Sequence, residues 1–207
     1  MKVSPRPAAP LPIDRADPGL PDGFAREALS LAMRSLDLAE RLQQPNSMSL
    51  ALAQVARSLK ALGAFGPAET YLGQALRWAG LLPGSDARVD LICELAEVCC
   101  AAAEAEQATH EDDRHAGRAE RERARDHAFE AAGLAGQTAD AHWEVKVLLR
   151  VSDVLDRCGD HEDAASMQNR AISLMGLCPD GDALPPQEAA ATPEPGWLLA
   201  PGSTLLM

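Results

Sequence analysis

The sequence predicts an all-α protein of about seven helices, and three observations support this fold class. Apolar residues recur every three or four positions throughout residues 22–176, as they do on one face of an α-helix. No bounded segment alternates between apolar and polar residues, as a half-buried β-strand does. Hydrophobic residues make up 46% of the chain but aromatic residues only 3%. Alanine and leucine therefore fill the core, which suits closely packed helices better than sheets.

The first predicted helix shows how the boundaries follow from the sequence. Its apolar face contains Leu29, Ala32, Leu36 and Ala39, and Pro45 disfavours a helical conformation in the residue before it. We therefore expect the first helix to cover residues 22–43. The same reasoning places six further helices at residues 47–62, 67–81, 85–108, 112–134, 138–158 and 162–175.

The turn between the second and third predicted helices contains two glycines and a proline. Gly63 is suited to end a helix in the left-handed conformation, because glycine has no Cβ to clash at positive φ. Pro67, which follows Gly66, is suited to the first helical position, where its missing N–H would have no partner in any case. The two helices are therefore expected to form a hairpin.

A similar pattern recurs around a second glycine, Gly159. Before Gly63 stand Leu52, Val55, Ala56 and Leu59, and the matching residues before Gly159 are Leu148, Val151, Ser152 and Leu155. After Gly63 stand Phe65, Ala68, Leu72 and Ala75, and the matching residues after Gly159 are His161, Ala164, Gln168 and Ala171. A small residue at these offsets lets two helices approach closely, and the large residues one turn away fill the space between neighbouring hairpins.

These two segments, "SLALAQVARSLKALGAFGPAETYLGQALRWAG" and "KVLLRVSDVLDRCGDHEDAASMQNRAISLMG", resemble the tetratricopeptide repeat family. The repeat unit of that family is a pair of helices with the pattern W-x2-L-G-x2-Y, then A-x3-F and a later P. The resemblance covers residues 22–178 and implies a right-handed superhelix, or α-solenoid, of antiparallel helix hairpins. A generic helical bundle is the alternative.

The sequence departs from the family pattern in several ways. Most aromatic positions are leucine, and the final proline is Gly80 or Gly176. Ala32 and Ala124 mark two further, degenerate units, and the spacings from Ala32 through Ala68 and Ala124 to Ala164 are 36, 56 and 40 residues. The middle hairpin is therefore lengthened, and the first unit lacks its first helix because a proline-rich arm replaces it.

The resemblance also implies a concave surface lined by the first helix of each unit. Matching offsets place on it Gln54, Arg57, Lys60, Asp90, Glu94, Glu97, Lys146, Arg150, Asp153 and Arg157. Two interpretations of these residues remain open. Arg57 and Arg150 pair with Glu94 and Glu97 across adjacent helices, or the basic ends of the groove receive the carboxylates of a bound peptide.

Two charged clusters are candidates for other chemistry. "HEDDRH", His110 to His115, comes close to the zinc motif H-E-x-x-H, but its second histidine falls five residues after the first and on another helix face. We expect a polar turn there, with Asp112 or Asp113 capping the next helix. "RAERERARDH" predicts a solvated face with Arg118–Glu122 paired, although its four arginines are also suited to docking an acidic segment.

Composition limits the remaining classes of function. The net charge of −12 argues against nucleic acid and anionic membranes as partners, and no apolar run is long enough to span a membrane. Five cysteines without a C-x-x-C pair argue against a disulfide framework and a zinc site, and favour a reducing, cytoplasmic location. We find no phosphate-binding loop or nucleophile elbow, and therefore expect neither enzyme activity nor a cofactor.

The two ends differ from the helical middle. Residues 1–21 predict a mobile, proline-rich arm, and residues 179–207, with four acidic and no basic residues, predict a disordered acidic tail. Within that tail, Trp197, Leu198 and Leu199 are a candidate anchor that docks back into the groove. The interpretation as a whole is an adaptor or scaffold that binds a protein or peptide, with a specific chaperone for a secreted or aggregation-prone client as the alternative.

Overall fold

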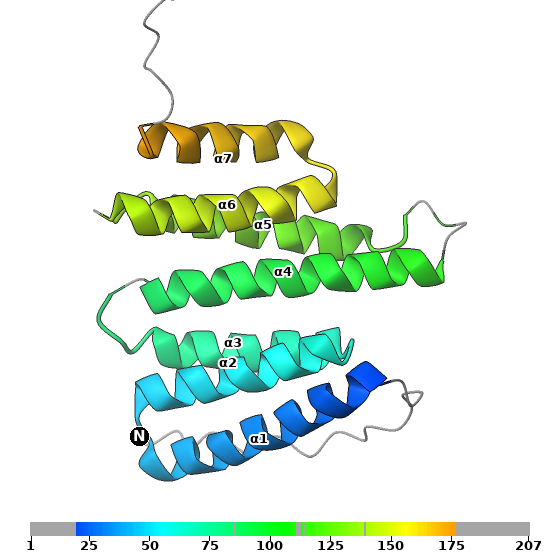
Figure 1. The fold of residues 1–207 in the computed structure, drawn as a ribbon, viewed down its shortest axis with the longest axis vertical. Coiled ribbons are helices and arrows are strands. Elements are labelled where there is room, and N and C mark those ends of the chain that lie inside the picture. Colours follow the sequence, from blue (N-terminus) through cyan, green and yellow to red (C-terminus); the bar gives the residue numbers. More distant parts are fainter. Residues whose placement is uncertain (1–19, 85, 111–112, 114, 139, 177–207) are drawn as a thin grey trace, which may run out of the picture.

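The computed structural model describes residues 20–176 except 85, 111–112, 114 and 139, and this part of the chain is all-helical. The seven helices are α1 (Leu20–Leu42), α2 (Pro45–Ala61), α3 (Phe65–Ala79), α4 (Asp86–Thr109), α5 (Arg118–Ala135), α6 (Ala141–Cys158) and α7 (His161–Leu174). They are stacked in one row from α1 to α7 (Figure 1). The predicted fold class and number of helices are thus confirmed for the described residues. None of the described helices is both long enough and apolar enough to cross a membrane.

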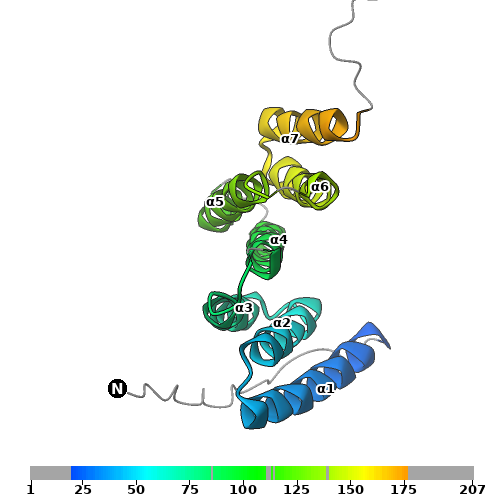
Figure 2. The same ribbon diagram turned by 90° about the vertical axis from the view of Figure 1, so that its left-hand side faces the viewer.

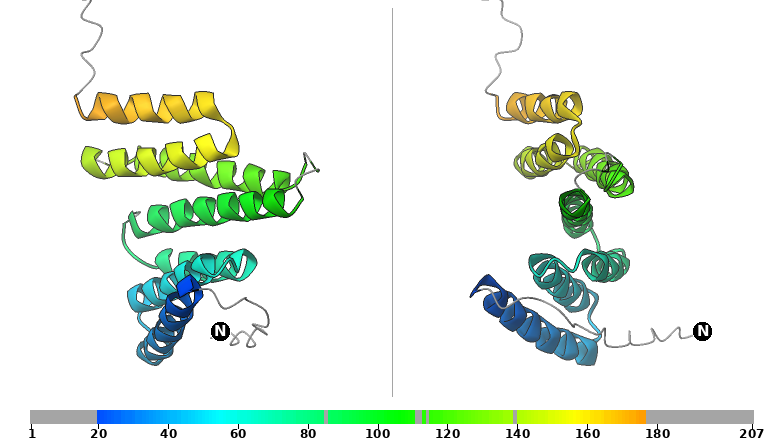
Figure 3. Two further views of the ribbon diagram at one scale, coloured as in Figure 1. Left: turned by 45° about the vertical axis from the view of Figure 1, so that its right-hand side comes forward. Right: turned by 90° about the vertical axis from the view of Figure 1, so that its right-hand side faces the viewer.

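Consecutive helices pack on one another as three hairpins that follow α1. The hairpins are α2 with α3, α4 with α5, and α6 with α7, and each contacts the next along the row. Seen along the helix axes, α3 and α5 lie on one side of the row and α2 and α6 on the other (Figures 2 and 3). These contacts are consistent with a helical repeat.

The turns of the first and third hairpins have the same backbone structure. Gly63 and Gly159 both adopt positive φ, at 72° and 91°. In each turn the N–H of the residue after the glycine donates to a carbonyl five residues earlier, from Ala64 to Leu59 and from Asp160 to Leu155, at 2.9 Å. The prediction that Gly63 ends a helix in the left-handed conformation is confirmed, and Gly159 repeats it.

Several predicted helix boundaries are wrong. Pro45 opens α2, two residues before the predicted start, because a proline in the first turn loses no helical hydrogen bond. For the same reason α3 begins at Phe65 and holds Pro67 in its first turn. The start of α5 is Arg118 rather than residue 112, because Gly117 takes a left-handed conformation and breaks the helix there. α6 starts at Ala141, after Asp140 accepts a hydrogen bond from the Trp143 N–H as its N-cap.

The small residues that defined the repeat are buried. Ala68 and Ala124 have no exposed surface, and Ala32 and Ala164 expose only 2% each. The residues four and seven positions after each of them are also buried wherever they are apolar, as at Ala39, Ala75, Ala131 and Ala171. Gln168, in the last described helix, is exposed because no further hairpin covers it in the described part of the chain. The prediction of which face of each helix is buried is therefore correct.

The core consists of two clusters that meet at α4. Leu91, Leu95 and Val98 belong to the cluster of α1, α2 and α3. Val89, Ile92 and Cys99, on another side of α4, belong to the cluster of α5, α6 and α7. Leu76 of α3 packs against both clusters. α4 is thus the central helix of the row, which accounts for its many buried residues.

Residues 1–19 and 177–207 lie outside the described part of the chain. The predicted arm at 1–21 and tail at 179–207 therefore remain predictions, as does the helical domain boundary at 22–178. The candidate anchor formed by Trp197, Leu198 and Leu199 also lies outside the described residues.

Candidate functional site

The surface with the clearest organisation is formed by one stripe each of α2, α4 and α6. We call it the α2–α4–α6 face. Ion pairs join its members from helix to helix, so residues nearly a hundred positions apart in the sequence lie on one surface. The charged and polar residues that define it are Gln54, Arg57, Lys60, Asp90, Glu94, Glu97, Glu104, Arg150, Asp153 and Arg157, together with Lys146, which its spacing of four residues from Arg150 places on the same side of α6.

The first ion pairs link α2 to α4. Arg57 makes a bidentate contact with Glu94, in which Nε donates to Oε2 at 3.1 Å and Nη2 donates to Oε1 at 2.5 Å. Lys60 Nζ lies 3.0 Å from Glu97 Oε2. Both pairs span 37 residues. They therefore fix the position of α2 against the next hairpin.

A second set of ion pairs links α4 to α6. Arg150 donates to Glu97 Oε1 at 2.8 Å and to Asp90 Oδ1 at 3.2 Å. Arg157 makes a bidentate contact with Glu104, with both distances 2.8 Å. Of the two interpretations of this surface left open by the sequence, pairing of Arg57 and Arg150 with Glu94 and Glu97 is the one the structure contains.

Glu97 is the central residue of this network, because it binds Lys60 of α2 and Arg150 of α6 at once. Burial acts to raise the pKa of Glu97, but its hydrogen bonds and charge interactions with Arg150 and Lys60 outweigh burial and lower that pKa. The pKa of Glu104 is lowered as well, chiefly by its hydrogen bonds from Arg157. Both carboxylates are therefore held in the charged form.

The lowered pKa of Glu97 predicts that this network fails in acid. A lowered pKa adds stability that is present above the ordinary value of about 4.3 and is lost as pH falls through the folded-state pKa. Glu97→Gln should reduce the free energy of unfolding by about 1–2 kcal/mol at pH 7, because Arg150 and Lys60 lose their shared partner while water still reaches them. The difference from wild type should shrink between pH 7 and pH 3 in urea unfolding. A constant difference over that range would contradict the assignment, and Glu122→Gln is the exposed control.

A pocket of about 210 Å³ lies within the network, between α2 and α4. Its charged rim is made by Arg57, Lys60, Glu94, Glu97 and Arg150, and Ala56, Leu72 and Val98 provide its apolar lining. The pocket is too small for a whole peptide but has room for one side chain with both apolar and polar atoms. The sequence correctly predicted that the rim residues share one face, but it did not predict the pocket itself.

Two exposed leucines on the same face were missed by the sequence analysis. Leu50 lies one turn before Gln54 on α2 and is 59% exposed. Leu149 lies between Lys146 and Asp153 on α6 and is 47% exposed. Both leucines could have been found from the sequence, because helical spacing places them beside the predicted residues of α2 and α6. They give the face apolar contacts at both ends of the charged network.

Lys146 differs from the other basic residues of this face. It is exposed and forms no ion pair with any described residue, whereas Arg57, Lys60, Arg150 and Arg157 each hold at least one carboxylate. The face has as many basic side chains (Arg57, Lys60, Lys146, Arg150 and Arg157) as acidic ones (Asp90, Glu94, Glu97, Glu104 and Asp153). The expected basic ends are therefore neutralised within the protein, except at Lys146.

The four arginines at the start of α5 also have partners within the chain. Arg118 pairs with Glu122 at 3.0 Å, as predicted. Arg123 binds Glu69 of α3, and Arg125 lies 3.4 Å from Asp163 of α7. Arg121 donates to Gln107 and to the Ala116 carbonyl. These side chains link α5 to α3, α4 and α7, rather than forming a free basic patch.

The histidine cluster and the cysteines do not form a second site in the described residues. His110 and His115 belong to no group of three or more described residues suited to a metal ion, and residues 111, 112 and 114 lie outside the described set. Asp113 accepts a hydrogen bond from the His115 N–H within this turn, and no described side chain caps α5, so the prediction that Asp113 caps the next helix is wrong. Asp112, the alternative cap, lies outside the described residues. Cys93, Cys99 and Cys100 are buried in α4. Burial raises the pKa of Cys93 to about 12 and that of Cys99 to about 11, so neither thiol is activated.

Comparison of the sequence with models of known protein families and with curated proteins gave no match to either. The assignment of a function therefore rests on the α2–α4–α6 face itself. Its features are a balanced charge network, one pocket and two exposed leucines.

Proposed function

We propose that this chain is an adaptor or scaffold that binds a protein or peptide along the α2–α4–α6 face, with no reaction of its own. The array is proposed to be a right-handed tetratricopeptide-like superhelix, in which this face is the concave one. The observation that carries the proposal is that equivalent stripes of three successive hairpins line one surface containing both a pocket and exposed apolar side chains.

The face is built to remain rigid while it binds. Its ion pairs connect α2 to α4 and α4 to α6, so that neighbouring hairpins hold a fixed spacing. A rigid surface loses little conformational freedom when a partner binds, and so retains more of the contact energy as affinity. This accounts for the neutralised arginines without assigning them to the partner.

The proposed partner is an extended or helical segment with apolar side chains and at least one carboxylate. Its apolar groups would cover Leu50 and Leu149, and an acidic side chain or C-terminal carboxylate would pair with Lys146. Apolar anchors of this kind supply most of the binding energy in peptide recognition, and the single charge contact mainly fixes the register. We therefore expect only weak dependence of affinity on salt, in contrast to a groove with open basic ends.

A specific chaperone is the second candidate, and the exposed leucines are what favour it. A chaperone uses such side chains to hold an unfolded stretch of its client without selecting one sequence. The two functions differ in what binds: an adaptor recognises one short segment, whereas a chaperone binds many segments of one unfolded client and keeps that client soluble.

Site-specific photocrosslinking in the native cell tests the location of binding. A photoreactive amino acid replaces Gln54 or Asp153 on the proposed face, and Glu122 on α5 is the matched exposed control. We expect crosslinks from both face positions to one short segment of one partner, and their loss when a synthetic peptide of that segment is added. Crosslinks to that segment from Glu122 alone would place binding on the other side of the row and contradict the proposal.

A further inference from the structure

The outer side of α1 has an apolar stripe that nothing in the described part of the chain covers. Phe24 is 77% exposed, Leu31 55%, and Leu38 and Leu42 60% each. They follow one another at intervals of seven, seven and four residues, which places them on one stripe of the helix. A separate stripe of α1, containing Ala32, Leu36 and Ala39, packs into the core. α1 therefore has two apolar stripes, and only one of them is used within the chain.

Comparison with α3 shows what this second stripe is suited to contact. The repeat offset of 36 residues relates Ala32 to Ala68, and it relates Ser35 and Leu42 of α1 to Tyr71 and Trp78 of α3. Tyr71 and Trp78 are partly buried against the core cluster that includes α2, the helix preceding α3. The helix before α1 is missing from the described structure, so the equivalent surface of α1 is open. The sequence of residues 1–19 contains five prolines, which disfavour a further helix in that segment.

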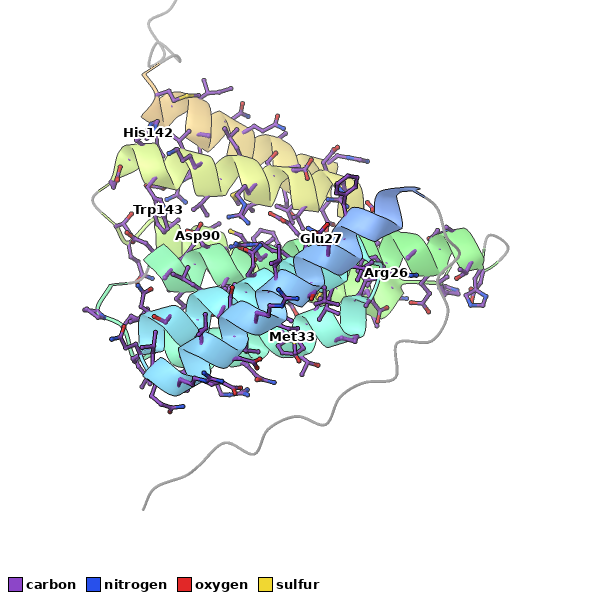
Figure 4. All side chains as sticks on the ribbon, turned by 60° about the horizontal axis from the view of Figure 1, so that its bottom comes forward. Arg26, Glu27, Met33, Asp90, His142 and Trp143 are labelled. Atoms are coloured by element: carbon purple, nitrogen blue, oxygen red, sulfur yellow. The ribbon has the colours of Figure 1, made fainter. Side chains whose placement is uncertain are left out.

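We propose that a second copy of this chain covers the stripe, with the two α1 helices packed antiparallel about a two-fold axis. Phe24, Leu31 and Leu38 occupy one core position of a heptad, and Ala28, Ser35 and Leu42 occupy the other. In antiparallel alignment Phe24 of one copy meets Leu42 of the other, Ala28 meets Leu38, and Leu31 meets Ser35. Each layer thus places a large side chain opposite a smaller or flexible one. Figure 4 shows α1 at the front of the molecule, where a second copy has access to it.

The charges beside the stripe fit this orientation. Glu27 and Arg41 occupy equivalent flanking positions near opposite ends of α1, and both are exposed. The antiparallel alignment brings Glu27 of each copy next to Arg41 of the other, which gives two complementary pairs. In a parallel alignment the Glu27 side chains of the two copies lie on opposite sides of the helix pair, as do those of Arg41, so neither complementary pair forms. Near the two-fold axis of the antiparallel alignment Arg34 of one copy approaches Arg34 of the other, and this like-charge contact opposes association.

The small size of the interface limits the affinity that we expect for the dimer. One helix pair is smaller than a standard stable protein–protein interface, so we expect a dimer in the micromolar range. Sedimentation velocity of the full chain over about 1–200 µM measures it directly. We expect the weight-average mass to rise from monomer towards dimer. A monomer at every concentration would overturn the proposal.

Charge exchange provides the sharper test, because it distinguishes this dimer from any other. Glu27→Arg alone and Arg41→Glu alone should each dimerise at least tenfold more weakly, since each creates two like-charge contacts. Mixing these two variants should restore association as a heterodimer, in which both contacts are again complementary. Failure of the mixture to associate when wild type does would overturn the antiparallel pairing.

Apolar variants test the stripe independently of charge. Leu31→Asp with Leu38→Asp should abolish association while the circular dichroism spectrum stays native, because both side chains are exposed in the monomer. Leu81→Asp, at a residue that is 66% exposed in the connection between α3 and α4, is the control and should leave the dimer unchanged. Dimerisation that survives the double change on α1 would show that another surface mediates it, and would overturn the proposal.

Discussion

Replacing Gly117 with alanine is expected to lower the free energy of unfolding by about 2–5 kcal/mol. Gly117 has φ 68°, a conformation that costs a residue with a Cβ about 1–2 kcal/mol. The added Cβ would also lie 2.5 Å from the carbonyl oxygen and 2.8 Å from the Cα of Ala103 in α4. These are backbone atoms and cannot move aside alone, so overpacking adds about 1–3 kcal/mol.

Gly159→Ala is the matched control for this prediction. Gly159 also has positive φ, at 91°, but an added Cβ meets no other atom within 4 Å. We therefore expect only the conformational cost of about 1–2 kcal/mol. Urea unfolding followed by circular dichroism measures both variants. Equal losses would show that α5 is not held against Ala103 as described.

Ala68→Leu is expected to lower the free energy of unfolding by about 1–3 kcal/mol. Ala68 has no exposed surface, and it lies in the seam between α2 and α3 where a larger side chain has no space. The neighbouring helices would have to separate, which also disturbs the core of the adjoining hairpin. Thermal unfolding should show a melting temperature lowered by several degrees.

Ala165→Leu provides the control for overpacking. Ala165 is exposed and directly follows Ala164, which is the residue equivalent to Ala68 in the last hairpin. The same chemical change at Ala165 should leave the melting temperature nearly unchanged. If Ala68→Leu were equally harmless, the repeat register derived from the small residues would be wrong.

The sequence was sufficient to predict the helices and their register, because both depend on local periodicity. The apolar stripes at 3.6-residue spacing located all seven helices, and the small residues Ala32, Ala68, Ala124 and Ala164 marked the tight helix contacts, where all four are buried. Gly63 was identified as a left-handed helix end because its role depends only on its own backbone.

The start of α5 could not be predicted in this way. The polar residues before Arg118 are compatible with a helix, and the break at Gly117 depends on its contact with the backbone of α4, which is distant in the sequence. The early starts of α2 and α3 were missed because a proline is tolerated at several positions of a first helical turn.

The residues of the candidate site were predicted from the sequence, but their interactions were left as two alternatives. The helical stripes identified Arg57, Glu94, Glu97 and Arg150 as sharing one face. Whether these arginines hold internal carboxylates or remain open to a partner depends on the spacing between helices, which periodicity does not reveal. The structure places Arg150 within 2.8 Å of Glu97, which is why the proposed function assigns recognition of a partner to other groups.

The central claim is that the α2–α4–α6 face binds a defined segment through Leu50, Leu149 and Lys146. Calorimetric titration with the peptide identified by crosslinking tests it most directly, using wild type, Leu50→Asp with Leu149→Asp, Lys146→Glu, and Leu81→Asp as the control. We predict that the double leucine variant binds at least ~10-fold more weakly, that Lys146→Glu binds several-fold more weakly, and that the control binds like wild type. Unchanged affinity in the double leucine variant, with native helix content, would contradict the account.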